Sequence, residues 1–493
     1  MDTQRQLVDR LRSTFRSGIT IPEQFRQTQL TMLMSMIQDN EEQILNALHK
    51  DLAKPKFEAI MSEIDIVINE LHYAIANLTS WMKPEYAGTN LATKLDDCSV
   101  RREPLGVVLI IGPWNYPLQL LIVPLIGAIA AGNCAVIKPS EVSSATDSLM
   151  AELIPKYLSQ DCYAVVSGGA EETKALVQNR FDHIFYTGSQ TVARSILRAA
   201  SDHLTPVTLE LGGKCPCLIY GKVNMASAAQ RLVWSKYFNA GQSCVAPDYV
   251  LCSQATRDAL LPALRQTLED FYSKDPQTCP DVSRIVSPQH WTRLMELLAR
   301  SRGKVVVGGE GNQEDKYIAP TVVVDVAEDD ALMEEEIFGP ILPIITAESL
   351  QEGIDFVNRK EKPLALYVFS EESSVRTRDS GPGFLLTFFF WAGELHTTIV
   401  NAVLEKTSSG GFCSNDGIVH MTLPTLPFGG VGASGCGSYH GRWSFETFSH
   451  RRAVMLRGWA LERLNSLRYP PYSEQKLSWL RWTTSAKSSC SLM

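Results

Sequence analysis

The chain has 493 residues and a mass of 54.7 kDa, enough for two or three domains or for one large α/β unit with an appendage. Hydrophobic residues make up 45% of it and charged residues 20%, so it can bury a large core, which excludes disordered, collagen-like and coiled-coil chains. The formal net charge of −8 makes the body of the protein a poor binder of nucleic acid.

The charge is unevenly distributed along the chain. Residues 449–493 contain eight basic and two acidic side chains, a net of +6, which leaves −14 on the 448 residues before them. A basic tail on an acidic body indicates that the tail has a surface partner of its own, for which anionic lipid is the natural candidate. The alternative is a solvated C-terminal arm.

The eleven cysteines are scattered, with no Cys-x-x-Cys pair and no Cys/His cluster at metal-ligand spacing. This pattern predicts reduced thiols in a cytosolic compartment, no disulfide framework and no metal site. The first residues, Met1–Arg5, lead into a polar amphipathic stretch without an apolar signal core, so secretion is not expected.

The first 80 residues show apolar faces at the 3.6-residue period of a helix. The predicted helices are Glu23–Met36, Glu41–Lys50 and Glu58–Met82. The next apolar segment, 105–137, has no charged residue and is long enough to span a bilayer, but Pro113, Pro117 and Pro124 interrupt it. We therefore interpret it as a buried strand, a loop, a buried helix and a second strand, over Val107–Ile111, Leu118–Ala131 and Cys134–Ile137.

Short apolar runs alternate with helical stretches from residue 101 onward. After the two strands above, the runs are Ala164–Val166, His183–Tyr186 and Pro206–Leu209. Such alternation predicts a parallel sheet with helices on both faces. Ligands of these sheets bind beyond the carboxyl ends of the strands, so chemistry is expected just after each run. A second α/β region follows, from about Gly212 to about Met421.

Three residues near strand ends or in tight turns have side chains suited to covalent catalysis. Cys244 ends the Gly-rich turn 241–244, where it is either an accessible nucleophile or, as free thiols often are, a buried structural residue. Glu210 stands at the mouth of an apolar strand, where a water-activating base would belong, although a glutamate before Gly-Gly is often a turn residue. Asn115 lies in a proline-flanked loop and offers an amide donor to a developing oxyanion.

Three further segments have side chains or backbone suited to a nucleotide. Lys138 and Glu141 follow the second strand, where they could hold a ribose. Gly188 and Ser189 form a Gly-Ser step at a helix start, where backbone N–H groups can meet a pyrophosphate. The sequence around them is not Gly-x-Gly-x-x-Gly, so this step alone is weak support for a dinucleotide. The third segment is EEIFGP, residues 335–340.

Taken in order, these segments resemble one family. The blocks GPWNYP (112–117), KPSE (138–141), YTGS (186–189), LELGGK (209–214), GQSC (241–244), EEIFGP (335–340) and LPFGGVG (426–432) are similar to those of the NAD(P)-dependent aldehyde dehydrogenases. The resemblance runs from about residue 5 to about 455, with an interruption at 376–399. The short N-terminal segment, SYHG (438–441) and SFETFSH (444–450) resemble class 3, the fatty-aldehyde branch, and the C-terminus favours its 3B subgroup.

The resemblance implies an α/β fold with a Rossmann-like cofactor-binding domain, an α/β catalytic domain and a small oligomerisation arm. The expected boundaries are 1–80 and 101–210 for the cofactor-binding domain, 211–420 for the catalytic domain, 81–100 and 421–448 for the oligomerisation segments, and 449–493 for a basic tail. A homodimer is expected.

The resemblance also implies a reaction. Cys244 would attack a medium- or long-chain, lipid-derived aldehyde, and the oxyanion would be held by the Asn115 amide and the Cys244 backbone N–H. Hydride transfer would leave a thioester, and Glu210 would activate the water that hydrolyses it to a carboxylate.

The resemblance assigns the cofactor contacts as well. Lys138 and Glu141 would bind the adenosine ribose, Gly188 and Ser189 the pyrophosphate, and Glu336 and Phe338 the nicotinamide end. A carboxylate on the ribose hydroxyls disfavours a 2′-phosphate, so NAD is expected and NADP is plausible.

Residues 376–399 depart from the family pattern. Val375 could join Val400 directly, but 24 residues intervene, including the aromatic run 384–391, which is too short to span a bilayer. Long loops cost little closure entropy, whereas an exposed aromatic run is an aggregation hazard. The insert is either a tolerated surface loop or the mark of a splice variant with impaired folding. The second interpretation leaves an inactive scaffold as a rival function; a CoA-acylating dehydrogenase is another rival, against which the retained Glu210 argues.

The sequence ends Cys490-Ser491-Leu492-Met493, which fits the C-a-a-X pattern and predicts prenylation at Cys490, more in keeping with farnesyl than geranylgeranyl. One prenyl chain anchors only marginally, so a second signal is needed. The tail offers apolar residues predicted to line one side of a helix and basic residues that extend towards headgroups. The apolar set is Leu456, Trp459, Leu464 and Leu467, the basic set Arg457, Arg463 and Arg468, and the pair Trp479 and Trp482 lies beside Arg481 and Lys487. The expected location is the cytoplasmic face of a membrane or a lipid droplet, with a cytosolic fraction.

Overall fold

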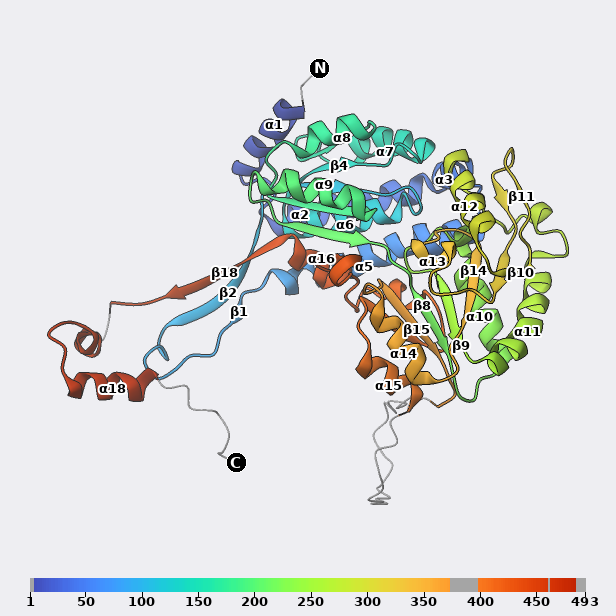
Figure 1. The fold of residues 1–493 in the computed structure, drawn as a ribbon. Coiled ribbons are helices and arrows are strands. Elements are labelled where there is room, and N and C mark those ends of the chain that lie inside the picture. Colours follow the sequence, from blue (N-terminus) through green and yellow to red (C-terminus); the bar gives the residue numbers. More distant parts are fainter. Residues whose placement is uncertain (1–3, 373–397, 460–461, 485–493) are drawn as a thin grey trace, which may run out of the picture.

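The computed structural model describes residues 4–372, 398–459 and 462–484. Two α/β units lie next to each other, and a slender arm projects from them (Figure 1). Most of the predicted insert, residues 376–397, lies outside the described residues, as does the predicted prenylation site Cys490.

The first unit is built on a six-stranded sheet in the order β17-β7-β6-β3-β4-β5. The five strands β7 to β5 are parallel, and β17 joins the edge in the antiparallel direction. The chain winds outward from β3 to β5 and then returns to β6 on the other side of β3, so the switch point, where such sheets bind ligands, lies between β3 and β6. The strands are β3 Val107–Ile111, β4 Cys134–Lys138, β5 Tyr163–Val165, β6 His183–Gly188, β7 Val207–Leu211 and β17 Gly435–Cys436.

Helices cover this sheet, as the alternating pattern predicted. Every residue of β3, of β4 and of the helix between them is buried, which explains why the segment 105–137 carries no charge. Across the described ranges, no helix combines the length and the apolar character needed to cross a membrane. The helices are α1 Gln4–Arg16, α2 Glu23–Asp39, α3 Glu41–Leu52, α4 Lys56–Ala59, α5 Asp65–Met82, α6 Gln119–Ala131, α7 Ser144–Tyr157, α8 Ala170–Val177 and α9 Gln190–Ser201. A π-helical turn, Ile60–Ile64, links α4 to α5.

The second unit is built on a seven-stranded sheet in the order β10-β13-β14-β9-β8-β15-β16, parallel except for β10. Its strands are β8 Pro216–Ile219, β9 Tyr249–Cys252, β10 Lys304–Val307, β13 Thr321–Val324, β14 Ile341–Thr346, β15 Ala365–Phe369 and β16 Gly411–Ser414. A short hairpin, β11 Gly311–Asn312 and β12 Tyr317–Ile318, lies beside it. The helices are α10 Met225–Tyr237, α11 Gln254–Tyr272, α12 Pro288–Arg300, α13 Ala331–Glu334, α14 Leu350–Arg359 and α15 Ile399–Lys406.

The arm is a three-stranded antiparallel sheet of β1 Glu85–Tyr86, β2 Asp97–Pro104 and β18 Ser449–Leu456. β18 pairs with the whole of β2, so Ser449–Leu456 lies in the arm and not in the tail that was expected to start at residue 449. Residues 421–448 do not join the arm sheet: β17 pairs with β7, and α16 Gly441–Thr447 packs against α6.

The helix predicted from Leu456 to Leu467 does not form. Leu456 ends β18 because the ladder with β2 continues to Asp97, and Arg457 is then held by the Asp96 carboxylate at 3.3 Å. Only a short helix, α17 Glu462–Asn465, and a 3₁₀ turn at 466–468 follow. The longer α18 Glu474–Thr484 contains the predicted tryptophan pair and lies at the far end of the arm (Figure 1).

Candidate active site

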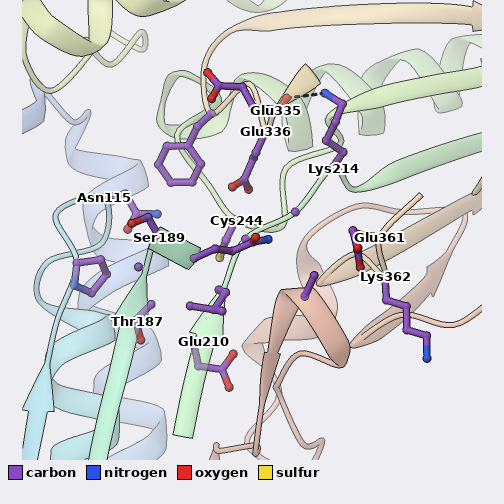
Figure 2. A pocket seen from close by; sticks show the side chains of 18 of the residues that line it. Asn115, Thr187, Ser189, Glu210, Lys214, Cys244, Glu335, Glu336, Glu361 and Lys362 are labelled. Carbon is purple, nitrogen blue, oxygen red and sulfur yellow. Dashed lines mark hydrogen bonds between the residues drawn. The ribbon is translucent and has the colours of Figure 1, made fainter. Parts of the chain in front are cut away.

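A cavity of about 590 Å³ opens where the carboxyl ends of β6 and β7 meet the second α/β unit. It collects most of the candidate residues from five separate segments of the chain. The predicted residues that line it are Asn115, Gly188, Ser189, Glu210, Cys244, Glu336 and Phe338. Figure 2 shows the side chain of Cys244 between those of Glu336 and Glu210.

Cys244 follows α10 and the 3₁₀ turn Phe238–Gly241, and it is partly exposed to the cavity. Burial, and then the nearby carboxylates of Glu336 and Glu210, raise the pKa of the Cys244 thiol above its ordinary value. The thiol is therefore protonated at neutral pH in the protein alone. Its use as a nucleophile requires a group that takes the proton.

Glu210 lies inside β7, whereas the sequence placed it just after the strand. The strand is longer than predicted because both neighbouring strands pair with it at this point, with Thr187 of β6 and Gly435 of β17 opposite Glu210. The side chain is 2% exposed, and neither carboxylate oxygen has a hydrogen-bond partner among the described residues. Burial raises the pKa of Glu210 well above its ordinary value. A buried carboxyl group without a protein hydrogen-bond partner among the described residues is suited to accept a proton from water or a thiol.

Asn115 lies in the loop between β3 and α6. Its side-chain amide donates to the carbonyl of Gln242 at 3.0 Å, which ties the predicted oxyanion donor to the loop that carries Cys244. Its backbone carbonyl accepts from Asn239 Nδ2 at 3.0 Å and from Lys54 Nζ at 3.1 Å. Asn115 is therefore fixed next to the Cys244 loop by hydrogen bonds of both its side chain and its backbone, an arrangement that suits an oxyanion donor.

A buried ion pair behind this loop was missed by the sequence analysis. Lys54 Nζ lies 2.6 Å from Glu63 Oε1, and both side chains are fully buried. The other carboxylate oxygen of Glu63 accepts from the backbone N–H groups of Leu118 and Gln119 at the start of α6. The only signal in the sequence is a charged residue inside a predicted apolar helix face.

The nicotinamide-side candidates lie on one loop. The Glu336 carboxylate lies against Gly212, so close that a Cβ at Gly212 would be 2.0 Å from Glu336 Oε2. Burial, and then the Asp248 carboxylate, raise the pKa of Glu336 to about 8. The Phe338 ring meets the Trp114 ring edge-on, with centroids 5.3 Å apart. Both rings line the cavity and give it an apolar wall.

Ser189 is the N-cap of α9, as predicted, and its hydroxyl accepts from Val192 N at 3.4 Å. The N-terminus of α9 opens into the cavity through Ser189 and Gln190. Free backbone N–H groups at such a position suit a phosphate.

Lys138 and Glu141 lie outside the residues that line the cavity. Lys138 ends β4, is buried, and donates to the Pro139 carbonyl at 2.7 Å and to Glu141 Oε2 at 3.2 Å. Glu141 is half exposed. Their role as ribose ligands stays a prediction.

Several cavity residues carry no sequence signal that singles them out. Trp114 contacts the ring of His290 at 4.9 Å, and Arg293 donates to the carbonyl of Ile337 at 2.6 Å. His290 and Arg293 come from α12, far from any quoted block. Their place in the cavity depends on the packing of α12, which the sequence alone does not reveal.

The residues present fit a dinucleotide. At one end of the cavity lies the N-terminus of α9, which suits a phosphate. At the other end, the apolar wall of Trp114 and Phe338 lies near the Cys244 thiol and the buried Glu210 carboxyl group. This combination suits a cofactor with a charged pyrophosphate at one end and a flat reactive ring at the other.

Comparisons with known proteins identify the relatives of this chain. The model of the "Aldehyde dehydrogenase family" matches residues 4–378. Aldehyde dehydrogenase family 3 member B1 of Homo sapiens is 50% identical over 494 residues, which cover 100% of both chains. Aldehyde dehydrogenase family 3 member B2 of Mus musculus is 50% identical over 483 residues, 98% of this chain and 95% of its own length. The substrate-bound structure of Staphylococcus aureus AldH matches with a TM-score of 0.90 and 39% identity, covering 98% of this chain and 99% of that one. The chain therefore belongs to the aldehyde dehydrogenase family, whose members are NAD(P)-dependent oxidoreductases, and within it to class 3, subgroup 3B.

Proposed function

We propose that this enzyme oxidises medium- and long-chain, lipid-derived aldehydes to carboxylic acids, with Cys244 as nucleophile and Glu210 as base. The observation that carries the proposal is the meeting of a thiol and an unpaired buried carboxyl group in one cavity, beside an amide donor. Cys244 releases its thiol proton to solvent, the thiolate adds to the carbonyl carbon, and the carbonyl oxygen takes the negative charge. Asn115 Nδ2 and the Cys244 backbone N–H stabilise that oxyanion, each donor contributing about 3 kcal/mol.

The remaining steps return Cys244 to its starting state. NAD(P)+ supplies the acceptor for the hydride that leaves the former aldehyde carbon, and a thioester on Cys244 remains. Glu210 takes a proton from water, the hydroxide adds to the thioester carbon, and the C–S bond breaks. The products are the carboxylic acid and the Cys244 thiolate, which takes the proton from Glu210 so that both groups regain their starting state.

For the cofactor, we propose that Lys138 and Glu141 hold the adenosine ribose, Gly188 and Ser189 the pyrophosphate, and Glu336 and Phe338 the nicotinamide end. The Glu141 carboxylate favours NAD over NADP, because it would repel a 2′-phosphate.

The mechanism is tested with the full chain and an aldehyde series from short to long acyl length. We expect NAD reduction that Cys244→Ala abolishes and that Cys436→Ser, a change at an exposed thiol, leaves intact. Product analysis with and without CoA distinguishes hydrolysis from CoA acylation. Turnover by Cys244→Ala, or a product that forms only with CoA, would contradict the proposal.

We further propose that the enzyme is prenylated at Cys490 and attached to the cytoplasmic face of a membrane or to a lipid droplet, with a cytosolic fraction. α18 supports a second contact with lipid, because Trp479 and Trp482 are each 52% exposed on it and Arg481 lies beside them. Trp459, 97% exposed, adds a third aromatic ring at this end of the arm. Cell fractionation of wild type, Cys490→Ser and Trp479→Ser/Trp482→Ser tests this. Identical distributions of all three between cytosol and membrane would contradict it.

We also propose that the enzyme is a homodimer in which the arm contributes to the interface. β18 is at the edge of the arm sheet within the described ranges, and Met455 and Leu456 on it are more than half exposed. An uncovered edge strand with apolar side chains favours pairing with a second copy. Sedimentation equilibrium of the full chain measures this, and a monomer at micromolar concentration would contradict it.

A further inference from the structure

Asp248 is a buried carboxylate four residues after Cys244, outside the cavity in which the reaction is proposed to occur. Its Oδ2 atom lies 2.6 Å from Lys214 Nζ. Ile337 donates its backbone N–H to the same carboxylate, 3.1 Å from Oδ1 and 3.3 Å from Oδ2. One carboxylate thus binds a side chain and a backbone group from two other parts of the chain.

These partners come from the segments that carry the other proposed catalytic groups. Lys214 is four residues after Glu210, and Ile337 is the neighbour of Glu336. Asp248 therefore connects the strand of the base, the loop of the nucleophile and the loop of the nicotinamide-side carboxylate. No other carboxylate among the described residues contacts all three segments.

Lys214 strengthens the connection at its own end. Besides the contact with Asp248, its ammonium group donates to the carbonyls of Leu332 at 2.7 Å and Glu335 at 3.0 Å, so all three N–H donors are used. Figure 2 shows the contact between Lys214 and Glu335. The group therefore holds Leu332 of α13 and the residue before Glu336. Charge-assisted bonds of this kind are the strong ones in a protein interior.

Backbone packing brings the same two loops into direct contact. A Cβ at Gly241, three residues before Cys244, would be 2.3 Å from the carbonyl oxygen of Gly339. This close approach leaves little freedom for the two loops to separate while Asp248 stays bound to Lys214 and Ile337. A displacement of the Glu336 loop is then transmitted to Cys244.

A second lysine adds to the electrostatic balance. Lys236 is fully buried on α10, and its Nζ atom has no hydrogen-bond partner among the described residues. It lies 3.9 Å from Asp248 Oδ1. Asp248 is thus the nearest counter-charge for one lysine and the direct partner of another. Loss of its charge would leave the fully buried Lys236 without this counter-charge and would remove the carboxylate partner of the partly buried Lys214.

We propose that Asp248 is a positioning residue, which with Lys214 and Lys236 fixes the Glu336 loop relative to Cys244 and Glu210. The inference rests on the proposed function only for the roles of Cys244, Glu210 and Glu336. A purely structural role would lower thermal stability without changing the geometry of the cavity.

Asp248→Asn in the full chain tests the proposal, with Asp182→Asn as the matched control. Asp182 is similarly bound, by Arg12 Nη1 at 2.6 Å and the backbone N–H of Val107 at 2.8 Å, but it lies at the opposite, amino end of the first sheet. Two readouts are needed. The first is the rate at which iodoacetamide alkylates Cys244, followed by mass spectrometry with Cys436 as the internal reference. The second is the dissociation constant of NADH from quenching of tryptophan fluorescence.

We expect Asp248→Asn to alkylate Cys244 about tenfold faster and to bind NADH about tenfold more weakly, because a loop displaced by about 1 Å is enough for changes of this size. Lys214→Met, which removes the other end of the ion pair, should give the same two changes, and the double variant should add little to either one. Asp182→Asn should leave both quantities within about twofold of wild type even if its thermal midpoint falls.

Unchanged or slower alkylation of Cys244 in Asp248→Asn and Lys214→Met would overturn the proposal, and so would a double variant whose effects are the sum of the single ones. If Asp248→Asn does not fold, Lys214→Met decides by the same criteria. A wild type that binds no NADH would contradict the proposed cofactor, whereas the alkylation rates would still decide the role of Asp248.

Discussion

Replacing Glu210 with glutamine keeps the shape of a side chain that is buried in β7 but removes its ability to accept a proton. A general base contributes about 10²- to 10⁴-fold to a rate. If Glu210 activates the hydrolytic water, Glu210→Gln therefore slows deacylation by that factor while the first hydride transfer continues. Rapid mixing with NAD and a long-chain aldehyde should then show one equivalent of NADH per active site, followed by almost no turnover. Mass spectrometry should find the acyl group on Cys244.

The same variant has a pH-dependent effect on stability whose sign follows from burial. The folded-state pKa of Glu210 is raised above its ordinary value of 4.5, so the folded chain retains a proton that the unfolded chain releases above that pH. The stability contributed by the protonated acid is fully present below pH 4.5 and is lost as the pH rises towards the folded-state pKa. Glutamine never ionises, so the variant gains on wild type by about 1.4 kcal/mol per pH unit in this window.

Denaturant unfolding of both proteins at pH 5, 6 and 7 measures this difference in the free energy of unfolding. If the difference in the free energy of unfolding does not grow with pH, the Glu210 carboxyl group is exposed to solvent. The argument that burial raises its pKa would then fail. Steady-state turnover by Glu210→Gln close to that of wild type would show that another group activates the water.

Three further predictions follow from the cavity and its surroundings. Gly212→Ala should lower kcat/KM for NAD about tenfold, because its Cβ would be 2.0 Å from Glu336 Oε2. Gly213→Ala serves as the control, since a Cβ at Gly213 would meet no atom closer than 3.4 Å. Equal kinetics of the two variants would contradict the proposed contact. The acylation rate should rise with pH between 6 and 9, since the pKa of both Cys244 and Glu210 is raised by burial and both are protonated at low pH; stopped-flow rates that fall over this range would refute it. Deletion of 376–399 should raise soluble yield and activity, because Ser374 and Val375 would replace Thr398, the N-cap of α15, and Ile399 in the same register; equal thermal midpoints and specific activities of the two forms would show that the insert does not impair folding.

The sequence was most informative where periodicity and burial coincide. The strand Val107–Ile111 was predicted with its observed bounds, because a short run of branched apolar residues bounded by Gly and Pro favours a buried strand over other structures. The helix α6 and the strand β4 were found to within one residue for the same reason. The end of β7 was misplaced because it depends on pairing with β6 and with β17, and β17 lies 225 residues away and leaves no local signal.

The site was predictable where a chemical group and a turn stand in one block. Cys244, Glu210, Asn115 and Glu336 meet in the cavity as the motifs suggested. The sequence did not predict the residues that position these side chains. Asp248 and Lys236 are single charged residues in buried segments, and only the packing of loops from distant parts of the chain brings them together.

The pairing of β17 with β7 also has a consequence for how the enzyme is made. Glu210 lies on a strand whose outer edge is completed only by Gly435 and Cys436, which leave the ribosome long after β7 itself. Until then the strand of the proposed base has an open edge, free to pair with another nascent chain. The sheet that holds Glu210 is therefore complete only when nearly the whole chain has been synthesised. A chain that stops before residue 435 would contain every proposed catalytic side chain and still lack the finished sheet that holds one of them.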